Sequence, residues 1–371
     1  MHSKITHAAA LALFLATSPA RADAPRADGG ALFTMTDDAA GNAVLAFARG
    51  QDGTLTATGV YPTDGAGSGG GEPVLGSQGA VTLSSDGRFL LVVNAGSDDI
   101  SSFRIDGARL TLVGRAPSGG TFPVSVAEHG GLVYALNAGG DGDISGLLLD
   151  EHGALTPLAD STRPLGSTAA GAAQVAFDRS GKVLAVTEKA AQEIVLYAVD
   201  RQGRASAPTP APSSGAVPFG FAFTIGDVLV VSEAGGGVSG TSAVSSYAVD
   251  GVSAEVVSSS VPNFQRAACW LVITRNGRHA YVANAGSGDI SAYRIDRQGE
   301  LTLPPGAEIA ATLPGGKPLD LALAGGDAFL YAVDASGHSI AGFSVGDDGA
   351  LTPFASGVSG LPASAVGLAA K

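Results

Sequence analysis

The sequence contains almost no cysteine. Its 371 residues include one, Cys269, which excludes an intramolecular disulfide. No histidine lies near Cys269 in the sequence to act as its base, so we interpret it as a small buried side chain beside Trp270 rather than as a nucleophile. The fold must therefore be stabilised by packing and by closure of the chain.

Long apolar runs are also missing. The run from Ala8 to Ala16 is too short to span a bilayer, and no later stretch approaches the ~20 apolar residues of a membrane-spanning helix. This run follows Lys4 and precedes two overlapping A-x-A sites between Ala20 and Ala24, which is typical of a cleavable export signal. We expect residues 1–24 to be a signal peptide and the mature protein to be soluble, in the periplasm or outside the cell.

Basic residues are scarce. The chain has 21 Lys and Arg against 34 Asp and Glu, a net charge of -13, and such a surface repels phosphate backbones and anionic lipids. We therefore expect neither a nucleic-acid partner nor a membrane partner. With 54 glycines, 45% hydrophobic residues and 15% charged residues, the chain is too apolar for disorder and too rich in turn formers for a helical fold.

Internal repeats are the strongest feature. LVVNAGSDDISSFRI at Leu91–Ile105 returns as YVANAGSGDISAYRI at Tyr281–Ile295 and, with one inserted residue, as YALNAGGDGDISGLLL at Tyr134–Leu149. Weaker copies end their apolar strand with another polar residue. In the strong and weak copies together, a polar residue follows the apolar strand at six positions with a mean spacing of 48 residues: Asn94, Asn137, Glu188, Glu233, Asn284 and Asp334. This spacing suits a four-stranded propeller blade, whose repeats run roughly 40 to 50 residues.

Each repeat divides into four strands joined by turns that contain Gly, as in Asn276-Gly277. The first copy starts at its second strand, Ala31 to Thr36, and the last copy is followed by a spare apolar segment, Leu361 to Ala370. Pairing these two segments would complete a seventh blade. We therefore predict an all-β, seven-bladed β-propeller over residues 30–371, closed by the C-terminal strand, and a monomer because a closed ring leaves no free sheet edge.

Common site motifs are absent or misplaced. Gly65 to Gly70 reads GAGSGG and satisfies G-x-G-x-x-G, but it lies in a loop between blades, without the helix that a phosphate site needs. The chain has no EF-hand spacing, no G-x-S-x-G and no H-E-x-x-H. We expect no cofactor and no metal site.

The repeats YVAN at Tyr281 and YALN at Tyr134, with the recurring G-x-L-T steps, resemble the YVTN-type repeat, which is WD40-like. Seven copies and a closing strand resemble the β-propeller lactonase family, related to 6-phosphogluconolactonase and carboxymuconate lactonizing enzymes. That family usually places histidine and arginine at the start of middle inner strands and a glutamate after a second strand. At the matching strand starts this chain has Ala172-Ala173-Gln174 and Pro218-Phe219-Gly220, so the family's histidine and arginine are missing. Glu233 stands where the family has its glutamate, and Glu188 stands where an aspartate is common.

The resemblance implies a hydrolase for a small polar lactone, or a lactonizing enzyme. On the propeller plan, the starts of the inner strands and the loops after the second strands share one rim. A base and an oxyanion-stabilising group are needed there, and Glu233 and Glu188 are the predicted bases. The predicted substrate-binding residues are Arg266, Lys317, Gln174, Gln78, Trp270 and Asp320.

Two alternatives stay open. The polar residues after the second strands can instead cap strand ends and bind turn amides, which is the preferred interpretation for the asparagines. The whole protein can also be a non-catalytic propeller that binds a small ligand or a protein partner on the same rim, since the fold serves both purposes.

Overall fold

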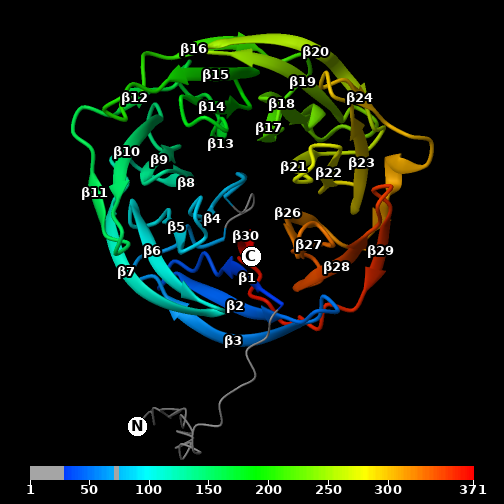
Figure 1. Cartoon of the computed structure of the whole chain (residues 1–371), viewed down its shortest axis with the longest axis horizontal. Coiled ribbons are helices and arrows are strands. Elements are labelled where there is room, and N and C mark those ends of the chain that lie inside the picture. The colour runs from blue at the N-terminus through cyan, green and yellow to red at the C-terminus, as the bar shows by residue number, and fades with distance from the viewer. Residues whose placement is uncertain (1–28, 71–74) are drawn as a thin grey trace, which may run out of the picture.

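The computed structural model describes residues 29–70 and 75–371, which form a ring of seven antiparallel sheets around a central channel (Figure 1). The seven-bladed all-β fold is confirmed. The predicted signal peptide lies outside the described residues. Within them, no helix has the length and apolar character needed to cross a membrane.

Each blade, numbered 1 to 7 along the chain, has four strand positions from the channel outwards. The innermost strands are β30 (Val366–Ala370) of blade 1, β4 (Val81–Leu83), β8 (Pro123–His129), β13 (Ala172–Phe177), β17 (Pro218–Phe223), β21 (Ala268–Ile273) and β26 (Pro318–Ala324). The second strands are β1 (Ala31–Met35), β5 (Phe89–Asn94), β9 (Leu132–Asn137), β14 (Val183–Glu188), β18 (Val228–Glu233), β22 (His279–Asn284) and β27 (Phe329–Asp334).

The third strands are still largely buried, whereas the outermost strands face solvent and are less regular. The third strands are β2 (Ala43–Arg49), β6 (Asp99–Asp106), β10 (Asp143–Leu149), β15 (Glu193–Ala198), β19 (Ala243–Asp250), β23 (Asp289–Ile295) and β28 (Ser339–Val345). The outermost strands are β3 (Leu55–Pro62), β7 (Arg109–Pro117), β11 (Leu155–Pro157), β12 (Arg163–Pro164), β16 (Thr209–Pro212), β20 (Ser253–Pro262), β24 (Leu301–Thr302), β25 (Ala311–Thr312) and β29 (Leu351–Phe354). Two short 3₁₀ turns, η1 (Gly235–Gly237) and η2 (Ala307–Ile309), lie in loops.

The second strands form the core between blades. β5, β14, β18 and β22 are buried along their whole length because both of their faces pack against neighbouring blades. Side chains from one blade also reach a turn glycine of the next: the hydroxyl of Tyr281 donates to Gly349 O at 3.0 Å, and that of Tyr134 to Gly203 O at 2.9 Å. Both glycines have positive φ, a conformation that favours glycine, and Gly349 is the glycine of a G-x-L-T step.

The ring closes as predicted. β30 pairs antiparallel with β1 and completes blade 1 from both chain ends, as the adjacent labels in Figure 1 show. Ala31 N donates to Lys371 O at 3.1 Å, and Lys371 N donates to Ala31 O at 2.8 Å. Leu361 and Val366 are both buried, at 7% and 0% exposure. The C-terminal strand is therefore part of the core rather than an appendage.

Deleting residues 361–371 should destabilise the whole ring. The deletion removes the ladder between β30 and β1 and the buried side chains of Leu361, Val366 and Leu368, each contributing roughly 1.5 to 3 kcal/mol. Thermal unfolding should show one transition at a much lower temperature. A truncated protein that melts at the wild-type temperature would contradict the closure.

A matched glycine pair tests the same closure with less damage. Gly367 and Gly360 both have a φ near +75, but a Cβ on Gly367 would lie 2.7 Å from Val81 Cγ2, whereas Gly360 has open space around it. Gly360→Ala should cost about 1 kcal/mol for the backbone alone, and Gly367→Ala clearly more. Equal costs would show that β30 is not tightly packed against blade 2.

Candidate functional site

The central channel is closed at one end. In five innermost strands the first residues are buried, while the last two are partly exposed, as in β4, β8, β13, β17 and β21. The channel therefore opens on the face that carries the turns between first and second strands. The opposite rim, where the sequence predicted the site, is covered.

The cover is the segment that precedes β4. Gln78 N donates to Ala173 O of blade 4 at 3.0 Å, and Ser77 Oγ to Val124 O of blade 3 at 2.8 Å. The Gln78 side chain reaches blade 6, where its amide bonds both Leu271 O at 2.8 Å and Leu271 N at 2.9 Å. Figure 1 shows this cyan segment reaching towards the centre of the ring. One short segment thus ties three blades together across the channel.

Side chains at the start of the innermost strands cap the next blade's free backbone edge. Ser125 Oγ accepts from Val175 N at 3.2 Å, and Gln174 Oε1 accepts from Phe221 N at 2.7 Å. These N–H groups face the channel and have no strand partner, so an unpaired one would cost about 1 to 3 kcal/mol. We call Ser125, Gln174, Gln78 and Asp320 the edge-capping residues.

Gly220 shows why Gln78 belongs to this set. In blade 5, Gly220 occupies the position that Gln174 holds in blade 4. A Cβ on Gly220 would collide with Oε1 of Gln78, so Gln78 fills the space of the missing side chain and caps Leu271 in its place. In blade 6 the same position is Trp270, which has no acceptor, and the next N–H, that of Leu321, is capped by Asp320 instead.

Asp320 is the charged member of the edge-capping residues. Its Oδ1 accepts from Leu321 N at 3.0 Å and its Oδ2 from Leu368 N of blade 1 at 3.2 Å. The side chain is 2% exposed, and burial raises its pKa from 3.8 to about 7, although the two N–H donors act in the opposite direction. Near neutral pH this carboxyl therefore exists in both protonation states.

Three of the predicted binding residues, Gln78, Gln174 and Asp320, line one cavity of about 250 Å³ in the channel. The rest of the wall comes from the innermost strands of blades 1, 2 and 7. These remaining lining residues are Gly79, Val81, Thr82, Leu83, Leu321, Ala322, Leu368, Ala369 and Ala370. The cavity is small, and its wall combines aliphatic side chains with a few convergent polar groups, as in small-molecule sites.

Trp270, predicted as a substrate-binding residue of the rim, seals the closed end. It is 4% exposed, donates from Nε1 to Ser77 O at 2.8 Å and packs on Phe219 with ring centroids 5.1 Å apart. Lys189 lies over the Phe219 ring at 4.9 Å and donates to Gly76 O at 2.5 Å, and burial lowers its pKa. Trp270 therefore anchors the segment before β4 instead of presenting a surface to a ligand.

Cys269 lies in the same layer and is buried, as predicted. Burial raises the pKa of its thiol to about 12, although Lys189 and Lys317 favour the thiolate. The thiol is therefore protonated at neutral pH and is a poor nucleophile.

The two predicted catalytic glutamates do not meet. Glu188 is 0% exposed, and its carboxylate accepts from Gly166 N at 2.7 Å and Ser167 Oγ at 3.2 Å. Glu233 is 1% exposed and accepts from Gly215 N at 2.8 Å and from the hydroxyls of Ser245 and Ser260. Neither lines the central cavity.

Burial raises the pKa of both Glu188 and Glu233, although their hydrogen bonds act in the opposite direction. Each carboxyl holds the linker that enters its own blade, through Gly166 and Gly215 respectively. Their contacts therefore show a structural use, and a catalytic role stays a prediction.

The repeated asparagines have a similar structural use. Asn284 Nδ2 donates to Asp289 Oδ1 at 2.7 Å and to Ser291 Oγ at 2.8 Å, and Asn94 bonds Asp99 and Ser101 in the same way. The N-x₄-D-x-S pattern of the repeat thus fastens the second strand to the third, which agrees with the capping interpretation.

The two predicted rim cations are placed away from the cavity. Arg266 is exposed, and its guanidinium donates to Gly286 O at 2.6 and 3.0 Å, within its own blade. Lys317 is partly buried, and its backbone N–H donates to Asp334 Oδ1 at 2.9 Å. Neither is among the residues that line the cavity.

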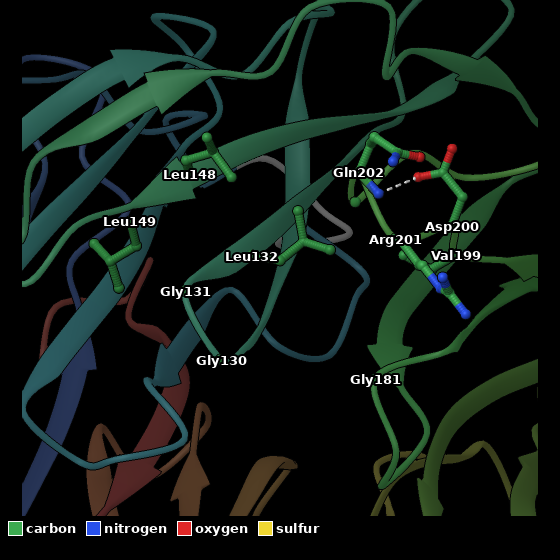
Figure 2. A pocket seen from close by; sticks show the side chains of 11 residues that line it. Gly130, Gly131, Leu132, Leu148, Leu149, Gly181, Val199, Asp200, Arg201 and Gln202 are labelled. Atoms are coloured by element: carbon green, nitrogen blue, oxygen red, sulfur yellow. Dashed lines mark hydrogen bonds between the residues drawn. The ribbon is translucent and has the colours of Figure 1, made fainter.

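A second hollow, of about 500 Å³, lies between blades 3 and 4 on the face where the channel opens (Figure 2). Glycine backbone and the side chains of Leu132, Leu148 and Leu149 form much of its wall. Its carboxylate, Asp200, is used within its own turn, where it accepts from Gln202 N at 2.9 Å and Arg204 N at 2.8 Å. Although larger, this hollow brings together no catalytic groups.

Sequence reasoning missed Ser77, Thr82 and Lys189. The signal for Ser77 was present: the repeat has no counterpart for residues 75–79, and an inner strand shortened to Val81–Leu83 points to an unusual segment before it.

Among the described residues, no three His, Cys, Asp or Glu side chains gather closely enough to hold a metal ion.

Comparison with known proteins agrees with this architecture. A candidate 6-phosphogluconolactonase from Bacteroides uniformis superposes with a TM-score of 0.72 at 18% sequence identity, covering 93% of this chain and 100% of that one. The periplasmic gluconolactonase PpgL from Pseudomonas aeruginosa superposes with a TM-score of 0.68 at 16% identity, covering 92% of this chain and 98% of that one. At these identities the likeness shows the fold alone. No curated protein matches the sequence. The family described as "Lactonase, 7-bladed beta-propeller" matches residues 40–163 and 233–360. The chain therefore belongs to the seven-bladed β-propeller lactonase family.

Proposed function

We propose that the protein hydrolyses a small polar lactone in the central cavity, with Asp320 as the general base. The observation that carries this proposal is that a buried carboxyl lines a small cavity in the channel of a lactonase-family propeller. Each Asp320 oxygen accepts one backbone N–H, which leaves acceptor capacity for a water molecule. The glutamates, by contrast, face linkers in separate blades.

The reaction follows from these positions. Asp320 takes a proton from a water molecule as the water oxygen forms a bond to the lactone carbonyl carbon. The tetrahedral oxyanion then collapses, the ring C–O bond breaks, and the proton returns from Asp320 to the leaving alkoxide. The product is the open hydroxy acid. Thr82 lines the same wall, and its hydroxyl, which donates to Gly79 O over a long 3.4 Å, is the proposed donor to the oxyanion after it turns towards the cavity.

Asp320→Asn should reduce kcat/KM by at least about 100-fold, the lower end of what a positioned base contributes. In the wild type, kcat/KM should rise with pH and level off above about 7, because only the ionised carboxylate can accept the proton. Both are measured on a lactone panel by the base consumed at constant pH, after subtraction of spontaneous hydrolysis. Wild-type turnover that is independent of pH between 5 and 9 would remove Asp320 from the mechanism.

Stability measurements control for the fold. Because the folded state raises the pKa of Asp320 from 3.8 to about 7, it binds the proton more tightly than the unfolded chain does. The unfolding free energy of the wild type, measured relative to that of Asp320→Asn, should therefore fall by up to ~4 kcal/mol as pH rises from about 4 to about 7. Above about pH 7 the difference should stay constant. A pH-independent difference would show that Asp320 is ionised throughout.

Glu188→Gln and Glu233→Gln should lower stability by about 1 to 3 kcal/mol each while leaving turnover within a few-fold of wild type, since each disturbs buried linker hydrogen bonds. Glu255→Gln, on an exposed position of β20, is the matched control and should change neither. If Glu233→Gln instead abolished turnover at an unchanged melting temperature, the base would be Glu233, as the family resemblance implies.

We also propose that the protein acts after export. The support is the sequence: Lys4, the apolar run from Ala8 to Ala16 and the A-x-A sites that follow. Intact-mass analysis of the mature protein should give a chain that begins between residues 21 and 25. Retention of residues 1–20 in the exported form would contradict this.

A further inference from the structure

The channel wall has an unusual charge composition. None of the seven innermost strands contains a lysine or an arginine, and their acidic residues are Glu128 and Asp320. Of the residues that line the central cavity, Asp320 is the charged one. Any ligand in this cavity therefore faces a carboxyl, amide groups, a hydroxyl and aliphatic side chains, and no positive charge.

Cations lie beyond both ends of the cavity wall. At the open end, Lys371 follows Ala370 directly, and its Nζ donates to Gly87 O at 2.8 Å, but it is not among the residues that line the cavity. At the closed end are Lys189 and Lys317. Lys189 is held over Phe219 and bonds Gly76 O, two residues before Gln78. Lys317 is not among the residues that line the cavity. Glu128, also towards the open end, accepts from Ser85 N at 2.5 Å and Gly131 N at 2.6 Å.

We propose that this propeller selects uncharged lactones and rejects lactones that carry a phosphate or carboxylate, and this rests on the proposed function. An anion loses its hydration in a narrow channel, and without a cation nothing compensates that loss. The ionised form of Asp320 adds like-charge repulsion inside the cavity. At about 250 Å³ the cavity is also smaller than the roughly 300 Å³ at which drug-sized pockets begin, so the ligand is a small, neutral, hydroxylated ring.

The direct test compares D-glucono-1,5-lactone with its 6-phosphate. The wild type should have a kcat/KM for the neutral lactone on the order of 100-fold above that for the phosphate ester. Leu83→Lys places an ammonium group at the partly exposed end of the cavity wall, and its long stem can follow the channel. That variant should raise use of the phosphate ester at least about tenfold, whereas the size-matched Leu83→Met should leave the ratio unchanged. Equal use of both lactones by the wild type would overturn the inference while leaving lactone hydrolysis standing.

Binding measurements separate the two proposals. D-glucono-1,5-lactam and its 6-phosphate resist hydrolysis, so calorimetry with them reports selectivity even if no lactone is turned over. The neutral lactam should bind at least about tenfold more tightly, and Asp320→Asn should narrow that gap by removing a negative charge. Tighter or equal binding of the phosphate, or binding of neither lactam, would overturn the inference. Absence of turnover with selective lactam binding would instead overturn the proposed hydrolysis alone.

Discussion

The free inner edge of the seven innermost strands is the constraint on which the rest of the structure depends. Each of these strands pairs with one neighbour only, so its other edge presents backbone N–H groups to the channel. At the closed end the molecule satisfies these donors with side chains from the preceding blade, as Gln174 does for Phe221 N. The capping links neighbouring blades at the axis, where the sheets approach most closely.

This constraint also decides where reactive groups can lie. A glutamine whose amide bonds a backbone N–H and C=O at once, like Gln78 on Leu271, has little capacity left for a ligand. A carboxylate differs because it has more acceptor sites than the two N–H groups it caps. Asp320 can therefore serve the strand edge and still face the cavity, which is why the chemistry is assigned to it and not to the amides.

The fold was readable from the sequence because it is repeated. Asn284 with Asp289, and Asn94 with Asp99, form the same local contacts, so one pattern gives the blade and its period. The closing strand was predictable for the same reason, since the first copy lacks its inner strand. The site was readable in part, since Gln78, Gln174 and Asp320 were predicted as binding residues and line the cavity. Their arrangement was not, because it depends on residues 75–79, which break the repeat and cross the channel to blade 6. No spacing rule connects Gln78 to Gly220, although they fill one space.

Glu233 shows that a residue at a family motif position can have surroundings in the fold that suit a structural role. Glu233 stands at the family's glutamate position, yet in this chain it is enclosed by Gly215 of the linker and by Ser260 of β20 in its own blade. A carboxylate that accepts three hydrogen bonds from its own blade and linker is well placed to order the loop, and poorly placed to meet a water molecule and a substrate together. Where the inner strands lack the family's histidine and arginine, the remaining titratable group in the cavity wall is the one that blade closure itself requires, Asp320. Its environment, buried yet facing a cavity, keeps it partly protonated near neutral pH, which is the property that the proposed general base requires.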